Sequence, residues 1–275
     1  MTTAPTEQVV TVDGQDLRVA VRSGQAGATP LLIINGIGAS LELLQPFVDA
    51  LEPDKSGDVI RFDVPGVGWS PLPSRPYRFS GLCRLIAKML SALGYGQVDV
   101  LGISWGGGVA QQFALSQRSR CRRLVLVSTA TGATMVPPKL SVLRQMAGRQ
   151  RYVDSGHLAI TAPALYGGSA RAEPERVSQA MHGNNHLGPP RGYAYQLAAS
   201  FAWSSVPFLP RLRQPTLIMS GDDDPIIPLA NARMMHRLIR GSRLHIFQGG
   251  HLGLVAEAAE LAPVVQEFLA ADPTG

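Results

Sequence analysis

Residues 98–110 read Val98-Asp-Val-Leu-Gly-Ile-Ser-Trp-Gly-Gly-Gly-Val-Ala110, and they are the strongest indication of the fold. Its apolar start predicts a buried strand that breaks at Gly102, and the small residues after Ser104 predict a helix to about Leu115. The pattern G-x-S-x-G at 102–106 places a serine in a strained turn between a strand and a helix. Its glycines lack a Cβ, so the strand and the helix can pass close together. We therefore expect the Ser104 hydroxyl to project from the sheet at a helix N-terminus.

The composition favours a folded α/β protein. The chain has 275 residues, of which 45% are hydrophobic, enough to bury a large core. No run approaches the roughly 18 apolar residues of a membrane span, and the first residues do not resemble a secretory signal, so we expect a cytoplasmic protein. Cys83 and Cys121 lack metal-ligand spacing and are expected to be reduced thiols, one in a helix and one before a strand.

The net charge of +5 does not by itself indicate a nucleic-acid partner. The arginines are spread over the whole chain and no nucleic-acid-binding motif accompanies them, which favours a solvated basic surface. One local group of basic residues leaves open a contact with an anionic lipid or a granule surface. The group comprises Lys139, Arg144, Arg149 and Arg151.

The order of the predicted elements indicates a mostly parallel sheet. Residues 9–21 form two alternating runs around Asp13-Gly14, which predicts an antiparallel hairpin. Later strands are expected at 31–34, 59–62, 98–102, 124–127, 215–220 and 243–247, and helices at 41–51, 79–93, 105–115 and 230–238, with a last helix ending near 268. This alternation predicts an α/β fold with an eight-stranded, mostly parallel sheet and helices on both faces.

The pattern changes between residues 131 and 213. Prolines and glycines separate short helix-like segments there, and no parallel strand is evident. We interpret this region as a helical cap inserted after the sixth strand. The chain then divides into a first core part (1–130), the cap (131–213) and a second core part (214–275).

Two glycine-containing loops do not fit a nucleotide site. The loop Asn35-Gly-Ile-Gly38 lacks the third glycine of a dinucleotide-binding loop, and no Walker lysine follows the loop at 63–70. Because the first loop follows a strand and lies near the G-x-S-x-G turn, Ile37 is placed to turn a backbone N–H towards an oxyanion.

Three chemically compatible residues follow predicted strands, at the edge where open α/β sheets bind ligands: Ser104, an aspartate within 222–224, and His251. A serine hydroxyl is a poor nucleophile at neutral pH. It needs an imidazole to accept its proton and a carboxylate to orient that imidazole. The order Ser, Asp, His along the chain is that of the α/β hydrolases.

Among the three aspartates the sequence favours Asp224, which stands third after Gly221 and is followed by Pro225. Asp222 and Asp223 suit turn formation better but stay open as alternatives. The other histidines are interpreted as structural, with a substrate contact left open for those in the cap; they are His157, His182, His186, His236 and His245. No cysteine or carboxylate stands at a ligand-like offset from them, so no metal is expected.

Seven motifs spread along the chain carry a family resemblance. They are Asn35-Gly-Ile-Gly-Ala39, Phe62-Asp-Val-Pro-Gly-Val-Gly68, Gly102-Ile-Ser-Trp-Gly-Gly107, Met135-Val-Pro137, Gln214-Pro-Thr-Leu217, Gly221-Asp-Asp-Asp-Pro225 and Gly250-His-Leu252. With these motifs the chain resembles the α/β-hydrolase superfamily and, within it, the intracellular medium-chain polyhydroxyalkanoate depolymerases of bacteria. It departs from their pattern at Ile103, where valine is more usual, and at 182–190 in the cap, which bears on substrate chain length.

The resemblance implies a serine hydrolase with Ser104 as nucleophile, His251 as base and Asp224 as the group that orients it. Its substrate would be a hydrophobic polyester, cleaved through an acyl-enzyme without a metal or organic cofactor. The backbone N–H groups of Ile37 and Trp105 would hold the oxyanion. Candidate substrate-binding residues are Asn35 in the first loop and six aromatic residues that also suit the core of the cap: Tyr152, Tyr166, Tyr193, Tyr195, Phe201 and Trp203.

Two other interpretations stay open. The same three residues serve small-molecule carboxylesterases, thioesterases and carbon–carbon bond hydrolases. A non-catalytic ligand-binding or granule-coat protein of the same fold is the alternative from another class. The expected partners are the polyester and, through it, a storage granule inside the cell, with no nucleic acid.

Overall fold

An eight-stranded sheet forms the centre of the computed structural model, which describes residues 5–146, 155–182 and 185–271. The strand order is β1-β2-β4-β3-β5-β6-β7-β8. The pairs β1–β2 and β2–β4 are antiparallel, and every later pair is parallel. The strands are β1 (Thr6–Val12), β2 (Gln15–Arg22), β3 (Leu31–Ile34), β4 (Val59–Phe62), β5 (Val98–Ile103), β6 (Cys121–Val127), β7 (Thr216–Gly221) and β8 (Arg243–Phe247). The fold class predicted from the sequence is confirmed.

The first hairpin has the turn that its sequence predicts. Val12 pairs with Gln15, which leaves Asp13 and Gly14 as the two turn residues. Their φ angles are 51° and 75°, the left-handed values that a type I′ hairpin turn requires. Aspartate and glycine tolerate these angles better than other residues, so the turn fixes the register of β1 on β2.

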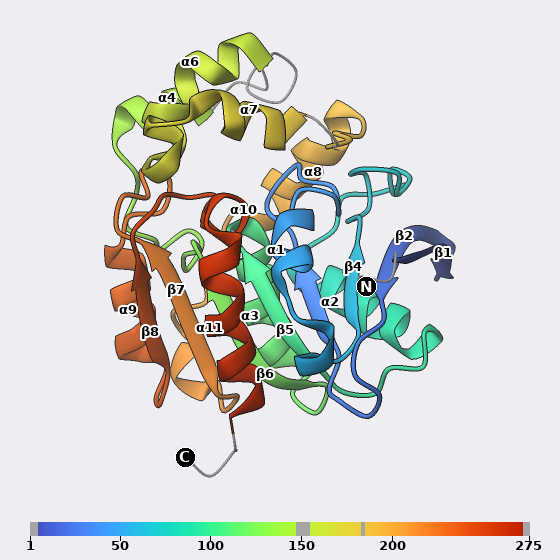
Figure 1. Cartoon of the computed structure of the whole chain (residues 1–275). Helices are drawn as coiled ribbons and strands as arrows, with labels where there is room; N and C mark the ends of the chain where they lie inside the picture. The colour runs from blue at the N-terminus through green and yellow to red at the C-terminus, as the bar shows by residue number, and fades with distance from the viewer. Residues whose placement is uncertain (1–4, 147–154, 183–184, 272–275) are drawn as a thin grey trace.

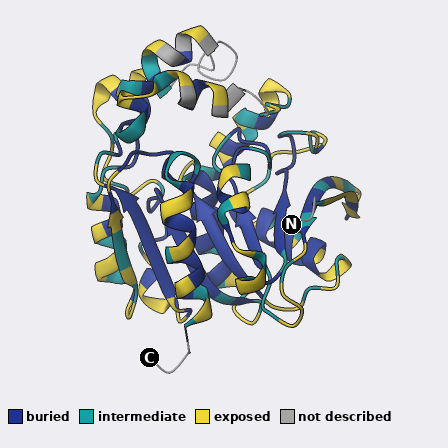
Figure 2. Cartoon of the chain, in the orientation of Figure 1, coloured by how far each residue is buried: buried dark blue, intermediate teal, exposed yellow. Residues whose placement is uncertain are grey.

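Helices cover both faces of the sheet (Figure 1). One face packs against α2 (Phe79–Ala92), α3 (Trp105–Ser116) and α9 (Ala230–Leu238), and the other against α1 (Gln45–Ala50), α10 (Gly253–Ala256) and α11 (Ala258–Ala270). The short apolar strands β3 to β7 are consequently buried, whereas the outer faces of the helices meet solvent (Figure 2). This burial explains the unbroken apolar runs at 31–34 and 124–127.

The chain between β6 and β7 forms helices above the sheet (Figure 1). Its elements are α4 (Leu140–Met146), α6 (Ser155–Tyr166), η2 (Gly168–Arg171), α7 (Pro174–His182), α8 (Pro190–Ser200) and η3 (Leu209–Arg211). The two ends of the region meet, because Ala133 N–H donates to the Trp203 carbonyl at 2.8 Å and Ser205 N–H to the Thr131 carbonyl at 3.1 Å. The division into core and cap at 131–213 stays a prediction, and we keep the name cap for these residues.

Two local expectations were wrong. The helix expected at 41–51 begins only at Gln45, because Pro46 occupies its first turn and the Leu41 N–H donates to Asp63 Oδ1 at 2.8 Å instead. Cys121 is the first residue of β6 and does not precede it.

Cys83 and Cys121 are both buried free thiols, and burial raises the pKa of each. None of the helices in the described residues has the length and apolar character needed to cross a bilayer.

Candidate active site

Ser104 occupies a strained turn between β5 and α3. Its φ and ψ are 53° and −121°, outside the regions that residues with side chains normally adopt. A Cβ at Gly102 would lie 2.5 Å from the Gly106 carbonyl oxygen, and one at Gly106 would lie 2.2 Å from the Ile34 carbonyl oxygen. The glycines of the motif are therefore required by close backbone approach, as the sequence predicts.

Strand β6 holds this turn in place from the side. The Ser104 N–H donates to the Val127 carbonyl at 3.0 Å, and the Thr129 hydroxyl donates to the Ser104 carbonyl at 2.6 Å. A Cβ at Gly107 would collide with Thr129, at 2.4 Å from its Oγ1. Thr129, two residues after the end of β6, supports the serine, and no local signal in the sequence singles it out.

The structure brings Ser104, His251 and Asp224 together. His251 Nε2 lies 3.1 Å from Ser104 Oγ, and His251 Nδ1 lies 2.8 Å from Asp224 Oδ2. The side chains of His251 and Asp224 are 7% and 0% exposed. Water is therefore largely excluded from the His–Asp contact, where a charge interaction is stronger than in solvent.

Asp224 has the orientation that a histidine-orienting carboxylate needs. Its Oδ1 accepts the N–H groups of Ile226 at 2.9 Å and Ile227 at 2.8 Å, which leaves Oδ2 for His251. Asp222 turns away and accepts the Gly249 N–H at 3.0 Å. The geometry thus favours Asp224 over both neighbours.

Asp223 connects this loop to the cap. Its carboxylate accepts the Gly168 N–H at 2.8 Å and forms an ion pair with Arg171 at 2.6 Å. The hydrogen bond from Arg171, more than any other contact, lowers the pKa of Asp223. The interpretation of Asp223 as a simple turn residue missed this contact, which joins segments about 50 residues apart in the chain.

Tyr166, at the end of α6, determines where His251 lies. The His251 N–H donates to the Tyr166 carbonyl at 2.8 Å, and the two rings are nearly parallel, with centroids 6.5 Å apart. A Cβ at Gly250 would lie 2.0 Å from the same carbonyl oxygen, so this contact requires glycine before the histidine.

The loop after β3 lies against Ser104. A Cβ at Gly36 would be 3.6 Å from Ser104 Cβ, and Ile37 borders the same cavity as Ser104. Trp105 is the first residue of α3, a position whose N–H has no acceptor within its own helix. Asn35, expected near substrate, instead donates from Nδ2 to the Ser40 carbonyl at 2.6 Å, within the loop.

Two buried or partly buried carboxylates, Asp63 and Glu42, hold the loop after β3 through hydrogen bonds. Asp63 accepts the N–H groups of Leu41 at 2.8 Å and Trp69 at 2.9 Å, and burial raises its pKa. Burial also tends to raise the pKa of Glu42, but hydrogen bonds from Ser40 and Arg18 lower it overall. Glu42 therefore remains a carboxylate that anchors the loop.

Two apolar cavities meet at Ser104. The first, of about 50 Å³, is bordered by Leu43, Met146, Tyr166, Ile226 and Leu252 together with His251. The second, of about 130 Å³, is bordered by Phe79, Met135, Trp203 and Ile227 together with Trp105. Tyr166 and Trp203 of the predicted substrate-binding set thus border cavities next to the serine.

The remaining predicted residues have other positions. Tyr193 packs in the apolar cluster of the cap, and Tyr195 is partly exposed. Phe201 is 86% exposed and borders neither cavity at Ser104, so it does not bind substrate there. Tyr152, Arg149 and Arg151 lie outside the described residues. Among the described residues, no group of three His, Cys, Asp or Glu side chains could hold a metal ion.

The chain matches a known protein family over most of its length. The family model described as alpha/beta hydrolase fold matches residues 29–258, which includes all three of Ser104, Asp224 and His251. The chain belongs to the α/β-hydrolase family.

Named relatives narrow the comparison for this α/β hydrolase. It is 50% identical over 263 residues to a poly(3-hydroxyalkanoate) depolymerase of Ectopseudomonas oleovorans, covering 95% of this chain and 92% of the relative. A crystal structure of a hydrolase from Pseudomonas aeruginosa PA01 has a TM-score of 0.78 and 26% identity, covering 97% of this chain and 99% of that one. An enol-lactonase from Burkholderia xenovorans LB400 shares the fold, with a TM-score of 0.79, 24% identity, and 96% and 100% coverage.

Proposed function

We propose that this α/β hydrolase cleaves the ester bonds of medium-chain poly(3-hydroxyalkanoate) through an acyl-enzyme on Ser104. The observation that carries the proposal is the hydrogen-bonded series Asp224–His251–Ser104, with contacts of 2.8 and 3.1 Å, placed where two apolar cavities meet. The 50% identity to a poly(3-hydroxyalkanoate) depolymerase supports this substrate over other esters.

The reaction follows from the geometry. Ser104 Oγ attacks the ester carbonyl carbon while His251 Nε2 accepts the hydroxyl proton, and Asp224 stabilises the imidazolium that forms. His251 then returns the proton to the leaving hydroxyl of the next monomer, which frees the alcohol and leaves an acyl-Ser104. Water attacks this ester with the same proton transfers and releases the 3-hydroxy acid. The N–H groups of Ile37 and Trp105 are our candidates for holding the oxyanion in both steps.

The cap region 131–213 supplies part of the apolar surroundings. Tyr166 and Met146 border the first cavity, and Met135 and Trp203 border the second, so cap residues lie on both sides of the serine. We assign the two cavities to the alkyl groups of the monomers on either side of the scissile ester. Apolar walls suit these groups, and burying them contributes about 0.8 kcal/mol per methylene.

The outer surface of the cap suits contact with a water-insoluble polyester. Most of the exposed large hydrophobic side chains in the described residues belong to it: Val136, Leu140, Leu143, Ile160, Leu197 and Phe201. Ile160 and Phe201 are 82% and 86% exposed. Exposed apolar side chains gathered on one region are typical of surfaces that bind an apolar partner. We therefore assign the cap as the part that meets the polymer, and through it the granule.

The test uses purified full-length protein with emulsions of medium-chain and short-chain polymer, and identifies released acids by mass. We expect 3-hydroxy acids or oligomers from the medium-chain polymer. Ser104→Ala should abolish release, whereas Ser116→Ala, which removes a hydroxyl that donates to the Gln112 carbonyl at the far end of α3, should not. No release from either polymer would overturn the depolymerase proposal.

The same assay separates the alternatives. Rapid cleavage of soluble esters or thioesters without release from polymer would identify a small-molecule hydrolase. Turnover by the wild type that Ser104→Ala abolishes would exclude a protein that only binds ligand.

A further inference from the structure

One cap residue contacts both of the segments that carry the candidate oxyanion-hole N–H groups. Gln196 of α8 is completely buried. Its Oε1 accepts the N–H of Gly38 at 2.8 Å, the residue after Ile37, and its main-chain carbonyl accepts the indole N–H of Trp105 at 2.9 Å. The loop after β3 and the serine turn are thus both attached to the same point of the cap.

The other end of this amide makes no compensating contact. Gln196 Nε2 is buried and has no hydrogen-bond partner among the described residues. A buried donor without an acceptor costs free energy of desolvation, and an apolar side chain of similar length would avoid this particular cost. The contribution of the glutamine therefore lies in what its oxygen does to Gly38.

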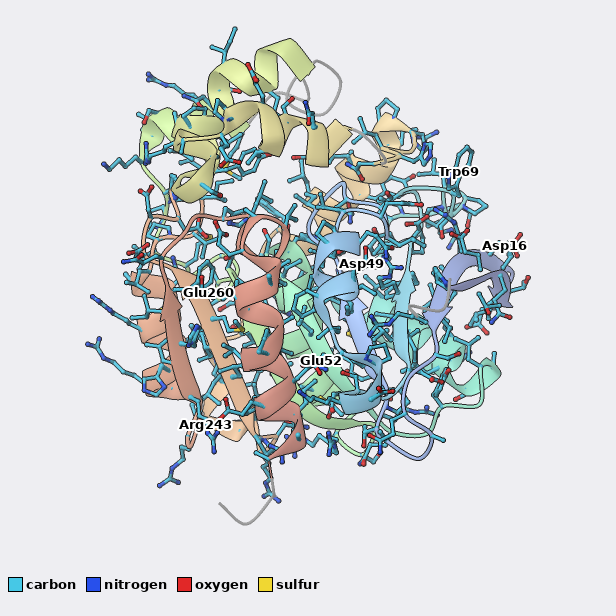
Figure 3. All side chains as sticks on the ribbon, in the orientation of Figure 1. Asp16, Asp49, Glu52, Trp69, Arg243 and Glu260 are labelled. Carbon is cyan, nitrogen blue, oxygen red and sulfur yellow. The ribbon has the colours of Figure 1, made fainter. Side chains whose placement is uncertain are left out.

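A second contact from the cap holds the same loop two residues later. Asn185 Oδ1 accepts the Ser40 N–H at 2.8 Å, and the His186 N–H donates to Ser40 Oγ at 3.2 Å. His186 also packs on Trp69, with ring centroids 4.5 Å apart. Figure 3 labels this tryptophan at the upper right of the view. The segment 185–196 therefore forms hydrogen bonds to this loop at two positions, Gly38 and Ser40.

Close packing of α8 on the core restricts movement of the segment that makes these hydrogen bonds. A Cβ at Gly192 would lie 1.7 Å from the Gly66 carbonyl oxygen, so the helix rests directly on the loop after β4. Gly38 has a φ of 70°, which glycine adopts readily and which gives the loop alternative conformations when nothing holds it. The Gly38 N–H and the Ile37 N–H belong to adjacent peptide groups, so fixing one restricts the other.

We propose that Gln196 is a positioning residue for the oxyanion hole, which makes the hole depend on the seating of α8 on the core. The proposal rests on the ester hydrolysis proposed above. Donors stabilise an oxyanion only when their direction is set before the reaction, and a small displacement reduces the rate strongly. The side chain of Gln196 acts through Gly38, whereas the contact with Trp105 is made by the main-chain carbonyl and survives substitution. Gln196 borders neither cavity at Ser104.

The decisive variant is Gln196→Met in the full-length protein, assayed with p-nitrophenyl octanoate, a soluble ester. Gln214→Met is the matched control, because its buried Nε2 donates to the Ala114 carbonyl at 2.9 Å on the side of the core away from the site. Gln196→Met loses one buried side-chain hydrogen bond, and Gln214→Met loses a buried one and a second, at 3.3 Å, from the Arg213 N–H, so the melting temperature of the control should fall at least as far. We expect kcat of Gln196→Met to fall by about tenfold or more, with KM changed by less than about threefold, and kcat of Gln214→Met to stay near that of the wild type.

A boronic acid inhibitor gives a second measurement that a merely structural role would not change. It forms a tetrahedral adduct with serine, so its affinity for Gln196→Met should weaken by about the same factor as kcat/KM. Asn185→Ala changes a half-buried loop residue and keeps the test available if Gln196→Met does not fold. It should lower kcat in the same direction, with KM little changed.

Each outcome has one interpretation. Wild-type kcat and inhibitor affinity in a folded Gln196→Met, or in Asn185→Ala if the first variant does not fold, would overturn the positioning role. A wild type no faster than Ser104→Ala on every ester would instead overturn the proposed hydrolysis, and is distinguished by that comparison.

Discussion

Replacing Asp224 with asparagine should almost abolish ester hydrolysis while leaving the fold intact. The reason lies in the two ends of the carboxylate. Oδ1 accepts two backbone N–H groups, from Ile226 and Ile227, and Oδ2 faces His251 Nδ1 at 2.8 Å. If the asparagine NH₂ group faced the N–H groups of Ile226 and Ile227, three hydrogen-bond donors would meet without an acceptor. The amide oxygen of the asparagine therefore has to take the Oδ1 position. The NH₂ group then faces His251.

This orientation forces the wrong tautomer on His251. A donor opposite Nδ1 makes Nδ1 the acceptor and places the ring proton on Nε2, which faces Ser104 Oγ at 3.1 Å. Nε2 then carries a proton and has no lone pair to accept the serine proton. In serine hydrolases with this geometry the same change lowers kcat by about 10⁴-fold, which corresponds to about 5 kcal/mol of activation free energy. Both backbone hydrogen bonds survive, so the free energy of unfolding should fall by only about 1 kcal/mol.

The measurement is kcat on p-nitrophenyl octanoate, with urea denaturation of the same preparations. Asp222→Asn is the matched control, because Asp222 accepts one N–H, from Gly249, and makes no contact with His251. It should retain kcat within about threefold. Activity of Asp224→Asn within tenfold of the wild type, or loss of activity in Asp222→Asn at unchanged stability, would refute the assignment of Asp224.

Three further predictions follow from individual contacts. Gly106→Ala, whose Cβ would lie 2.2 Å from a carbonyl oxygen, should lower the free energy of unfolding by about 3 kcal/mol or more in urea denaturation, whereas Gly81→Ala in α2, with nothing closer than 3.9 Å, should raise it by up to about 1 kcal/mol. Arg171 lowers the pKa of Asp223, so this pair stabilises the fold above the unfolded pKa of about 4 and loses its effect as the pH falls through the lower folded pKa. Asp223→Asn should consequently be less stable than the wild type at pH 7, by less than about 1 kcal/mol because both side chains are about half exposed, and the difference should vanish under acid; a constant difference would contradict this. Met135→Trp should narrow the second cavity and lower kcat/KM for octanoate esters more than for butyrate esters, and an equal loss for both would argue against an alkyl site there.

The parts of the site that the sequence predicted depend on local backbone geometry. The turn at Ser104 needs glycines at fixed offsets, and the chain has them at 102 and 106 for reasons that the structure makes visible. The hairpin at Asp13-Gly14 is similar, because only a few residues tolerate two consecutive left-handed conformations. Such requirements act over four or five residues and therefore leave a readable pattern.

Contacts between distant segments left no such pattern. Thr129, Arg171 and Gln196 each support the site from another element, and the partners of Gln196 lie 91 and 158 residues away in the chain. A glutamine in a short helix, taken alone, is compatible with many environments. The tyrosines and tryptophans of the cap show the same limit, since Tyr166 and Trp203 border the cavities at Ser104 while Phe201 lies in solvent.

Local sequence patterns were enough to predict the sheet, the serine turn and the order of three polar residues at the edge of the sheet. Periodicity, turn chemistry and close backbone approach are local, so each constrains the residue types that encode it. Three other features became visible only in the folded chain: which aspartate oxygen faces His251, which aromatic residues border the serine, and which cap residue holds the loop beside it. These features depend on how separate elements pack, and the free energy of packing is shared among many residues without specifying any one of them.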